Sequence, residues 1–151
     1  RFFGHRGSGK RDEKARLGSW DSAMIRGVGI DMVDVKRFKA AMKRFKGRLE
    51  KRLFTEAELS YCALSRNPER HLATRFAAKV SAFKALGRTL PYKDVEITRD
   101  SNGRPALKVK GIEKGFKLSL SLSHEKTFGL AETIVETFDG SSLFQREVRR
   151  D

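Results

Sequence analysis

The sequence predicts an α+β domain in which an antiparallel sheet packs against helices. Leucine and serine alternate over residues 118–123, with the period of two that strands have. Asn102-Gly103 separates two shorter strand patterns, as in a hairpin with a tight turn. Residues 71–87 instead carry apolar side chains at helical spacing. The predicted order is one strand, two or three helices and two hairpins.

The domain is expected to occupy residues 24–137. Residues 1–23 are polar and glycine-rich and lack the apolar stretch of a signal peptide. We expect them to be a disordered extension, an upstream translation or a cloning remnant. Residues 138–151 lose all periodicity and are predicted to form a polar tail. The chain length suits one domain with a sizeable core.

The formal net charge is +14 and the pI is about 10.3. This balance implies an acidic partner: nucleic acid, an anionic membrane, a polyphosphate ligand or an acidic protein. No stretch approaches the roughly 18 apolar residues of a membrane span. Cys62 is the single cysteine, which excludes an internal disulfide and favours a reducing, cytoplasmic location. Its apolar helical surroundings argue against a nucleophilic role.

Residues 25–35 (IRGVGIDMVDV) are predicted to form the first strand, with Gly27 and Gly29 permitting a close backbone approach. Asp31 lies within this apolar run, where a carboxylate is costly unless it is paired, hydrogen-bonded or bound to a cation. Asp34 is better placed to cap the following helix. A structural role and a cation-binding role for Asp31 both remain open.

Residues 36–65 are predicted to be helical, with a break near Phe54-Thr55 and Thr55 as the N-cap of the second segment. Only Glu50 offsets the positive charges of the first segment. Solvated helix faces usually mix signs, so this segment is expected to dock onto an acidic surface. Its apolar stripe consists of Phe38, Ala41, Met42, Phe45 and Leu49. Its cations are Arg37, Lys39, Lys43, Arg44, Lys46, Arg48, Lys51 and Arg52.

Arg75 to Gly87 (RFAAKVSAFKALG) form the central predicted helix, and Gly87 is a natural residue just past a helix end. Phe76, Val80 and Phe83 line one face. Its cations are Arg75, Lys79 and Lys84. The helix is either a core helix whose long side chains reach water or the wall of an anion site.

Two hairpins are predicted to follow, formed by residues 94–98 with 106–109 and by 118–123 with 128–137. His124 stands at the end of a strand in the second hairpin. A lone histidine is more often a hydrogen-bonded turn residue, yet catalytic residues gather at such places. Both interpretations of His124 remain open.

The side chains singled out above suit chemistry at a phosphate. The sequence contains no GxxxxGK[ST], paired CxxC or HExxH motif. The candidates comprise one cation-binding group and several anion-binding groups, which suits a metal-assisted reaction at a phosphate or diphosphate. These candidates are Asp31, Arg75, Lys79, Lys84 and His124. They include no covalent nucleophile, so a substrate would have to supply one.

Three segments, GVGIDMVDVKRF, RFAAKVSAFKALG and SLSHEKTFGLA, resemble the signature segments of the holo-acyl-carrier-protein synthases, the small class of 4'-phosphopantetheinyl transferases. The likeness runs from Met24 to about Glu136. It implies the phosphopantetheinyl-transferase-like fold. It also implies that the phosphopantetheine arm of coenzyme A is transferred to a serine of apo acyl carrier protein, leaving adenosine 3',5'-bisphosphate. The nucleophile would then belong to the carrier protein.

By this resemblance, Asp31 holds Mg2+ against the diphosphate and Lys84 lies closest to the chemistry, so these two are the expected catalytic residues. The residues expected to contact coenzyme phosphates are Arg75, Lys79, Lys84 and His124. The acidic carrier protein is expected to dock onto Arg37 and Arg44. The family is typically a homotrimer with active sites at subunit interfaces, and the resemblance implies a place in cytoplasmic fatty acid and lipid biosynthesis.

The sequence departs from the family pattern at Val80, where the family has a glutamate that is the second protein ligand to the metal. It also has Gly87-Arg88-Thr89 in place of Gly-Thr-Gly. Because Mg2+ relies on few protein ligands, loss of one carboxylate is expected to weaken its binding. Glu125 is a candidate replacement for the missing carboxylate.

Two alternative functions are considered beside the transferase. One is a non-catalytic module that binds coenzyme A and the carrier protein, motivated by Val80. The other is a nucleic-acid-binding protein, motivated by the net charge of +14. No recognisable nucleic-acid motif supports the second, and the aromatic side chains of the basic helix fall in its apolar stripe.

Overall fold

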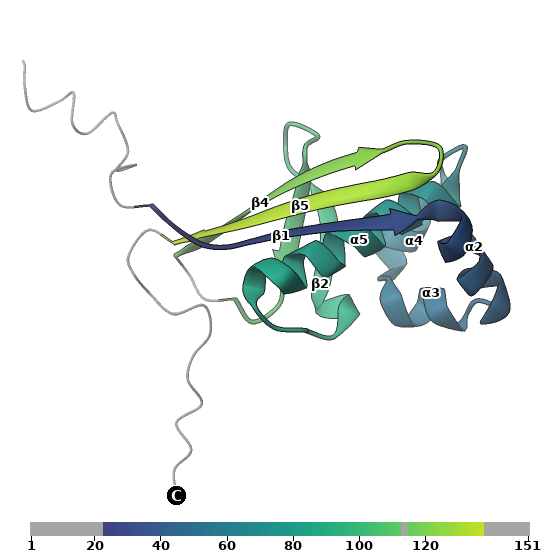
Figure 1. The fold of residues 1–151 in the computed structure, drawn as a ribbon, viewed down its shortest axis with the longest axis horizontal. Helices are drawn as coiled ribbons and strands as arrows, with labels where there is room; N and C mark the ends of the chain where they lie inside the picture. Colours follow the sequence, from purple (N-terminus) through teal and green to yellow (C-terminus); the bar gives the residue numbers. More distant parts are fainter. Residues whose placement is uncertain (1–22, 113–114, 138–151) are drawn as a thin grey trace, which may run out of the picture.

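The computed structural model describes residues 23–112 and 115–137 and has the predicted α+β architecture (Figure 1). The elements are β1 (Met24–Asp34), α2 (Val35–Arg44), α3 (Arg48–Leu53), α4 (Glu56–Ala63), α5 (Pro68–Leu86), the 3-10 turn η2 (Tyr92–Asp94), β2 (Val95–Arg99), β3 (Pro105–Val109), β4 (Phe116–His124) and β5 (Phe128–Thr137). The predictions for residues 1–22 and for the tail from Phe138 lie outside the described residues.

Three long antiparallel strands form the main sheet in the order β1-β5-β4. β5 lies in the centre, and Ala131 is paired with Asp31 on one side and Leu122 on the other. β2 and β3 form a separate two-stranded antiparallel sheet. The first strand and both predicted hairpins are therefore confirmed.

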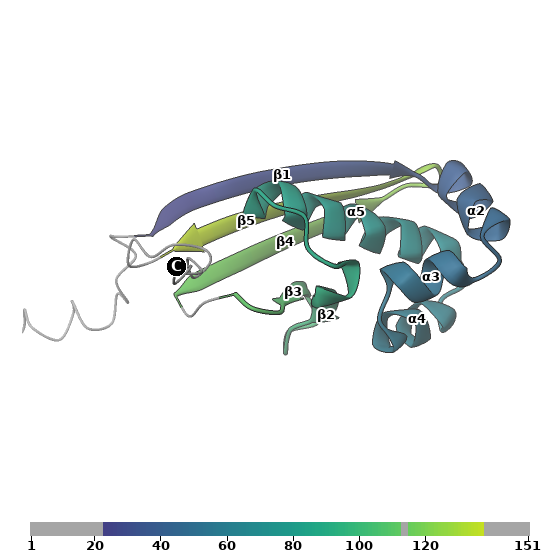
Figure 2. The same ribbon diagram turned by 90° about the horizontal axis from the view of Figure 1, so that it is seen from below.

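Helix α5 runs along one face of the main sheet, and the β2–β3 hairpin lies on the other side of the helix (Figure 2). Strand β1 can lie close to α5 because two of its residues are glycines, which have no side chain. A Cβ atom on Gly27 would lie 1.9 Å from the Ala85 carbonyl oxygen, and one on Gly29 would lie 2.0 Å from that of Ser81. The backbones of β1 and α5 are thus in direct contact, as the glycines predicted.

The core has two parts that meet along α5. Small residues of α5 pack against the sheets in the first part, whose buried members include Ala78, Ala82, Val95, Ala131 and Val135. The shorter helices close the second part, whose buried members are Phe38, Met42, Leu53, Phe54 and Ala73. No helix in the described ranges is long and apolar enough to cross a membrane.

The predicted helix over residues 36–65 is divided into three in the structure. The break at Phe54-Thr55 is confirmed, and Thr55 caps α4 with a reciprocal pair of hydrogen bonds to Glu58. A second break follows α2, because Lys46 and Gly47 have positive φ angles of 47° and 78°. Phe45 caps the end of α2 and is exposed, so its predicted place in the apolar stripe is wrong.

Candidate active site

Asp31 and Lys84 meet where β1 crosses α5. The Lys84 ammonium donates to Asp31 Oδ1 at 3.0 Å and to the Ile30 carbonyl oxygen at 2.8 Å. The Asp31 side chain is 18% exposed and that of Lys84 is 53% exposed. Asp31 is therefore a paired carboxylate that still has access to solvent, which is compatible with both roles left open by the sequence.

Val80 lies one helical turn before Lys84, and both line a shallow surface depression. Valine offers no metal-binding atom there. Glu125 is exposed, and its carboxylate accepts a hydrogen bond from the Lys126 backbone amide, so nothing places it beside Asp31. Within the described ranges, no group of three or more His, Cys, Asp or Glu side chains could hold a metal. A Mg2+ ion held by Asp31 would therefore need substrate phosphates and water to complete its shell.

Lys79 is fully buried and uses all three of its donors inside the core. Its ammonium pairs with Glu58 Oε2 at 2.8 Å and donates to the carbonyl oxygens of Tyr92 at 2.8 Å and Val95 at 2.5 Å. Burial lowers the pKa of Lys79, and the Glu58 carboxylate opposes that shift. This environment contradicts the prediction that Lys79 contacts a phosphate, because its ammonium has no open side.

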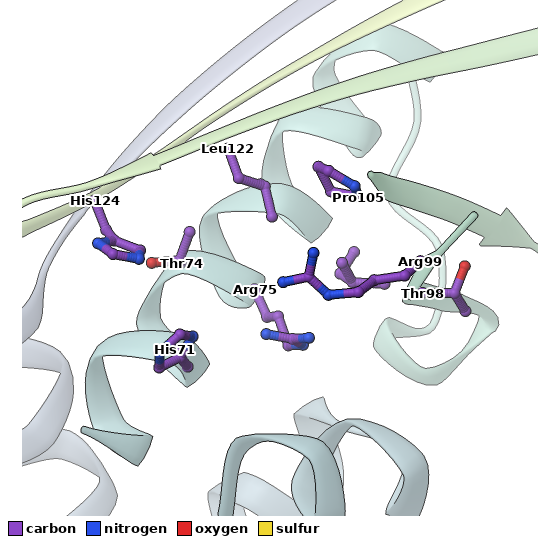
Figure 3. Close-up of a pocket in the computed structure, with 9 residues that line it drawn as sticks. His71, Thr74, Arg75, Thr98, Arg99, Pro105, Leu122 and His124 are labelled. Carbon is purple, nitrogen blue, oxygen red and sulfur yellow. The ribbon is translucent and has the colours of Figure 1, made fainter. Parts of the chain in front are cut away.

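Arg75 and His124, in contrast, line a pocket between α5 and the two sheets (Figure 3). Side chains come from the start of α5, from β2 and β3, and from the end of β4. The lining residues are His71, Thr74, Arg75, Ile97, Thr98, Arg99, Pro105, Leu122 and His124. Segments far apart in the sequence therefore build one pocket that contains two arginines and two histidines.

The two arginines of this pocket are held by Tyr61 of α4. The Arg75 guanidinium lies 4.2 Å from the centre of the Tyr61 ring, and Arg99 donates to the Tyr61 hydroxyl from Nε at 2.9 Å and Nη2 at 2.6 Å. Among the described residues, neither arginine forms an ion pair with a carboxylate. Arg75 is only 6% exposed, and its buried Nε has no hydrogen-bond partner there. A buried guanidinium of this kind is a strong candidate to bind an anion.

The histidines His71 and His124 face each other across the pocket, with ring centroids 5.5 Å apart and planes at 71°. Burial, followed by the charges of His124 and nearby arginines, lowers the pKa of His71. His71 and Arg99 were not predicted as site residues. The sequence signal for His71 is its position one turn before Arg75 on the same helix. Tyr61 and Arg99 are 38 positions apart, and no local pattern connects them.

Four of the predicted site residues form two pairs along α5. Asp31 and Lys84 lie near its end, and Arg75 and His124 lie near its start. Arg75 and Lys84 are nine positions apart, which is roughly 13 Å along a helix. The structure therefore brings the predicted residues together in pairs and separates the pairs from each other.

The basic face of α2 is exposed, as predicted. Arg37 and Arg44 are two helical turns apart and both are exposed. Phe38 and Met42 on the opposite side are buried. Lys39 pairs with Glu69 at 2.9 Å, and this interaction lowers the pKa of the Glu69 carboxyl.

The sequence model of the 4'-phosphopantetheinyl transferase superfamily matches residues 27–136. The chain belongs to this superfamily. The match includes every predicted site residue. The resemblance inferred from the three segments is therefore confirmed at the level of the superfamily.

Individual phosphopantetheinyl transferases are similar over almost their whole length. The holo-[acyl-carrier-protein] synthase of Thermodesulfovibrio yellowstonii is 39% identical over 114 residues, covering 74% of this chain and 99% of that protein. The Geobacter sulfurreducens synthase is 43% identical over 109 residues, covering 70% of this chain and 85% of that protein.

Solved transferase structures share the fold. The Neisseria meningitidis synthase superposes with a TM-score of 0.67 at 30% identity, covering 76% of this chain and all of that chain. The Bacillus anthracis synthase, solved in complex with coenzyme A (3',5'-ADP), gives 0.65 at 29% identity, covering 76% of this chain and 98% of that chain. The Helicobacter pylori synthase, solved in complex with coenzyme A, gives 0.62 at 26% identity, covering 72% of this chain and 98% of that chain.

Proposed function

We propose that the chain is a holo-acyl-carrier-protein synthase. The observation that carries the proposal is the superfamily match over residues 27–136, together with curated synthases matched over nearly their entire length. The pocket beside Arg75 adds chemical support, because the residues that line it include two arginines and no carboxylate. This arrangement suits the phosphates of coenzyme A better than a neutral ligand.

In the proposed reaction, a serine hydroxyl of the carrier protein attacks the phosphorus that bears the pantetheine. The bond from that phosphorus to the bridging oxygen breaks, and the electron pair leaves with adenosine 3',5'-bisphosphate. The serine proton passes to solvent or to a nearby base. The Lys84 ammonium would stabilise negative charge that develops on the diphosphate. Arg75 and His124 would hold the coenzyme at its phosphates without taking part in bond exchange.

Asp31 would hold Mg2+, which neutralises charge on the diphosphate when bound. With valine at position 80, Asp31 is the one protein carboxylate that the proposal assigns to the ion. The coenzyme must then supply a larger share of the coordination, and binding of the ion should depend strongly on coenzyme.

Arg37 and Arg44 would dock the acidic carrier protein. Their exposure on one side of α2, with Phe38 and Met42 buried on the other, supports this role. Surface charges of this kind mainly steer association and set its salt dependence.

A homotrimer is proposed on the basis of β1. This edge strand points Val28, Ile30 and Met32 outward, with 55%, 56% and 61% of their surface exposed. An apolar row of this size on one strand is typical of a protein interface. Asp31 lies between two of these residues in the sequence but faces α5, where it pairs with Lys84. A subunit packed on the apolar row would therefore cover the strand that carries Asp31, and we propose that the active site lies close to this interface. Light scattering should give three times the chain mass, and a monomer would contradict the proposal.

The test of the function is incubation of the protein with coenzyme A, Mg2+ and apo acyl carrier protein, followed by mass spectrometry of the carrier. We expect the carrier to gain the phosphopantetheine arm. Val80→Glu should lower the Mg2+ concentration needed for half-maximal rate, whereas Val80→Gln, of similar size but uncharged, should not. No modification by either the parent chain or Val80→Glu would overturn the catalytic proposal.

The second candidate is a binding module without catalysis, favoured by Val80 alone. It predicts that coenzyme A binds with similar affinity with and without Mg2+ in calorimetry. A strong requirement for Mg2+ would exclude it.

A cytoplasmic location and a place in fatty acid biosynthesis follow from the transferase proposal and have the same support.

A further inference from the structure

His71 lies at a point where positive charge converges from three elements. His124 approaches from the end of β4, and Arg99 extends from β2 (Figure 3). On its own helix, Arg70 and Arg75 lie nearby and also disfavour its protonation. No carboxylate is among the residues that line the pocket. Protonation of His71 is therefore disfavoured in the free protein.

An anion in the pocket would reverse this balance. A phosphate group could accept hydrogen bonds from the buried Arg75 Nε and from the guanidinium of Arg99. Its negative charge would then lie beside His71 and favour the protonated imidazole, which can donate from both ring nitrogens. The proton would come from solvent.

We propose that His71 is a phosphate-binding residue of this chain that takes up a proton when the coenzyme binds. The inference rests on the proposed function only in taking coenzyme A as the ligand. His71 was not among the site residues predicted from the sequence, and the proposed reaction does not use it. His71 would strengthen coenzyme binding below neutral pH and contribute little at alkaline pH.

The sign of the effect follows from linkage. In the free protein the pKa of His71 lies below its ordinary value, and in the complex it would be raised. Between these two values, binding takes up a proton, so affinity rises as pH falls, by up to about tenfold per pH unit. A phosphate monoester also titrates near pH 6, so the contribution of His71 is measured as a difference from a variant.

Titration calorimetry with coenzyme A, in two buffers of different protonation enthalpy, measures the proton uptake directly. The parent chain should take up more protons at pH 7 than His71→Gln, which should bind about tenfold more weakly at pH 6. His71→Lys carries a charge that does not titrate in this range, so it should keep the affinity and lose the extra uptake. Lys108→Gln, an exposed cation outside this pocket, should behave like the parent chain.

Equal proton uptake by the parent chain and His71→Gln would overturn the inference while leaving the proposed function intact. Failure of the parent chain to bind coenzyme A would overturn both. Repeating the titrations with 3'-dephospho-coenzyme A identifies the phosphate. Loss of the extra uptake assigns His71 to the 3'-phosphate, and its retention assigns His71 to the diphosphate.

Discussion

Lys79 and Lys84, five positions apart on α5, have opposite environments. Lys79 is fully buried and paired with Glu58, whereas Lys84 is half exposed and paired with Asp31. The first joins α5 to α4 and to the start of β2. The second leaves its ammonium accessible to a ligand. The same residue type on one helix therefore serves stability in one case and is available for chemistry in the other.

Glu58→Gln should destabilise the protein strongly, because it removes the charge that compensates the buried Lys79 ammonium. Breaking a buried pair from one side costs about 3–5 kcal/mol of unfolding free energy. Urea denaturation measures this loss. Glu69→Gln, which breaks the exposed pair with Lys39, should cost less than about 1 kcal/mol. Similar losses in the two variants would show that the Lys79 ammonium does not depend on Glu58.

At the scale of elements, α4 supports the pocket of Arg75 and Arg99, although no α4 residue lines that pocket. Its single exposed tyrosine, Tyr61, aligns Arg75 from α5 with Arg99 from β2. An uncharged support orients both cations and leaves their charge available for an anion. A carboxylate in the same place would have neutralised them.

Substitutions of Tyr61 should therefore weaken coenzyme binding in a graded way. Tyr61→Phe removes the acceptor for Arg99 but keeps the ring beneath Arg75, and Tyr61→Leu removes both. We expect KM for coenzyme A to rise by about threefold in the first and about tenfold in the second. KM for the carrier protein should remain unchanged. An equal rise in both KM values would indicate a general loss of structure.

The contact between β1 and α5 gives a second prediction at this scale. Gly29→Ala would place a methyl group against the Ser81 carbonyl oxygen and force the strand and helix apart. The expected cost is about 1–3 kcal/mol in thermal or urea unfolding. Arg26→Ala, on an exposed position of the same strand, should change stability by less than about 0.5 kcal/mol. A neutral Gly29→Ala would mean that the helix can shift at little cost.

For the whole molecule, the distribution of charge matters more than its total. The net charge of +14 includes an exposed basic surface on α2 and a more enclosed basic pocket beside α5. The first suits a macromolecule and the second a small anion. In the proposed function, these two surfaces would bind the two acidic substrates separately.

The double variant Arg37→Glu/Arg44→Glu should separate these two functions. It should raise KM for the carrier protein by about tenfold or more at low salt and leave KM for coenzyme A nearly unchanged. The difference from the parent chain should shrink at high salt because the interaction is screened. Lys110→Glu, at an exposed cation directly after β3, serves as the control. An equal effect of the control would indicate that only net charge matters.

The sequence predicted what depends on local patterns. The strand period, the hairpin turn, the Thr55 cap and the β1 glycines each depend on a few neighbouring residues. It did not predict contacts between distant segments, such as Glu58 with Lys79 or His71 with His124. These pairings determine which cation is buried and which faces a pocket. Gly47 was a local signal for the end of α2 that the strongly basic pattern around it obscured.

The capping box of α4 also limits how the molecule can move. One Glu58 carboxylate caps the helix at Thr55, accepts the Ile97 backbone amide at 3.0 Å and neutralises Lys79. Helices of eight residues usually fray, yet opening α4 would leave the buried Lys79 ammonium without its counter-ion and the Ile97 amide without its acceptor. Local opening of α4 is therefore nearly as costly as global unfolding. The amide hydrogens of α4 should then exchange with solvent as slowly as those of the core. If the chain binds a carrier protein through α2 as proposed, α4 should therefore keep its position in the complex.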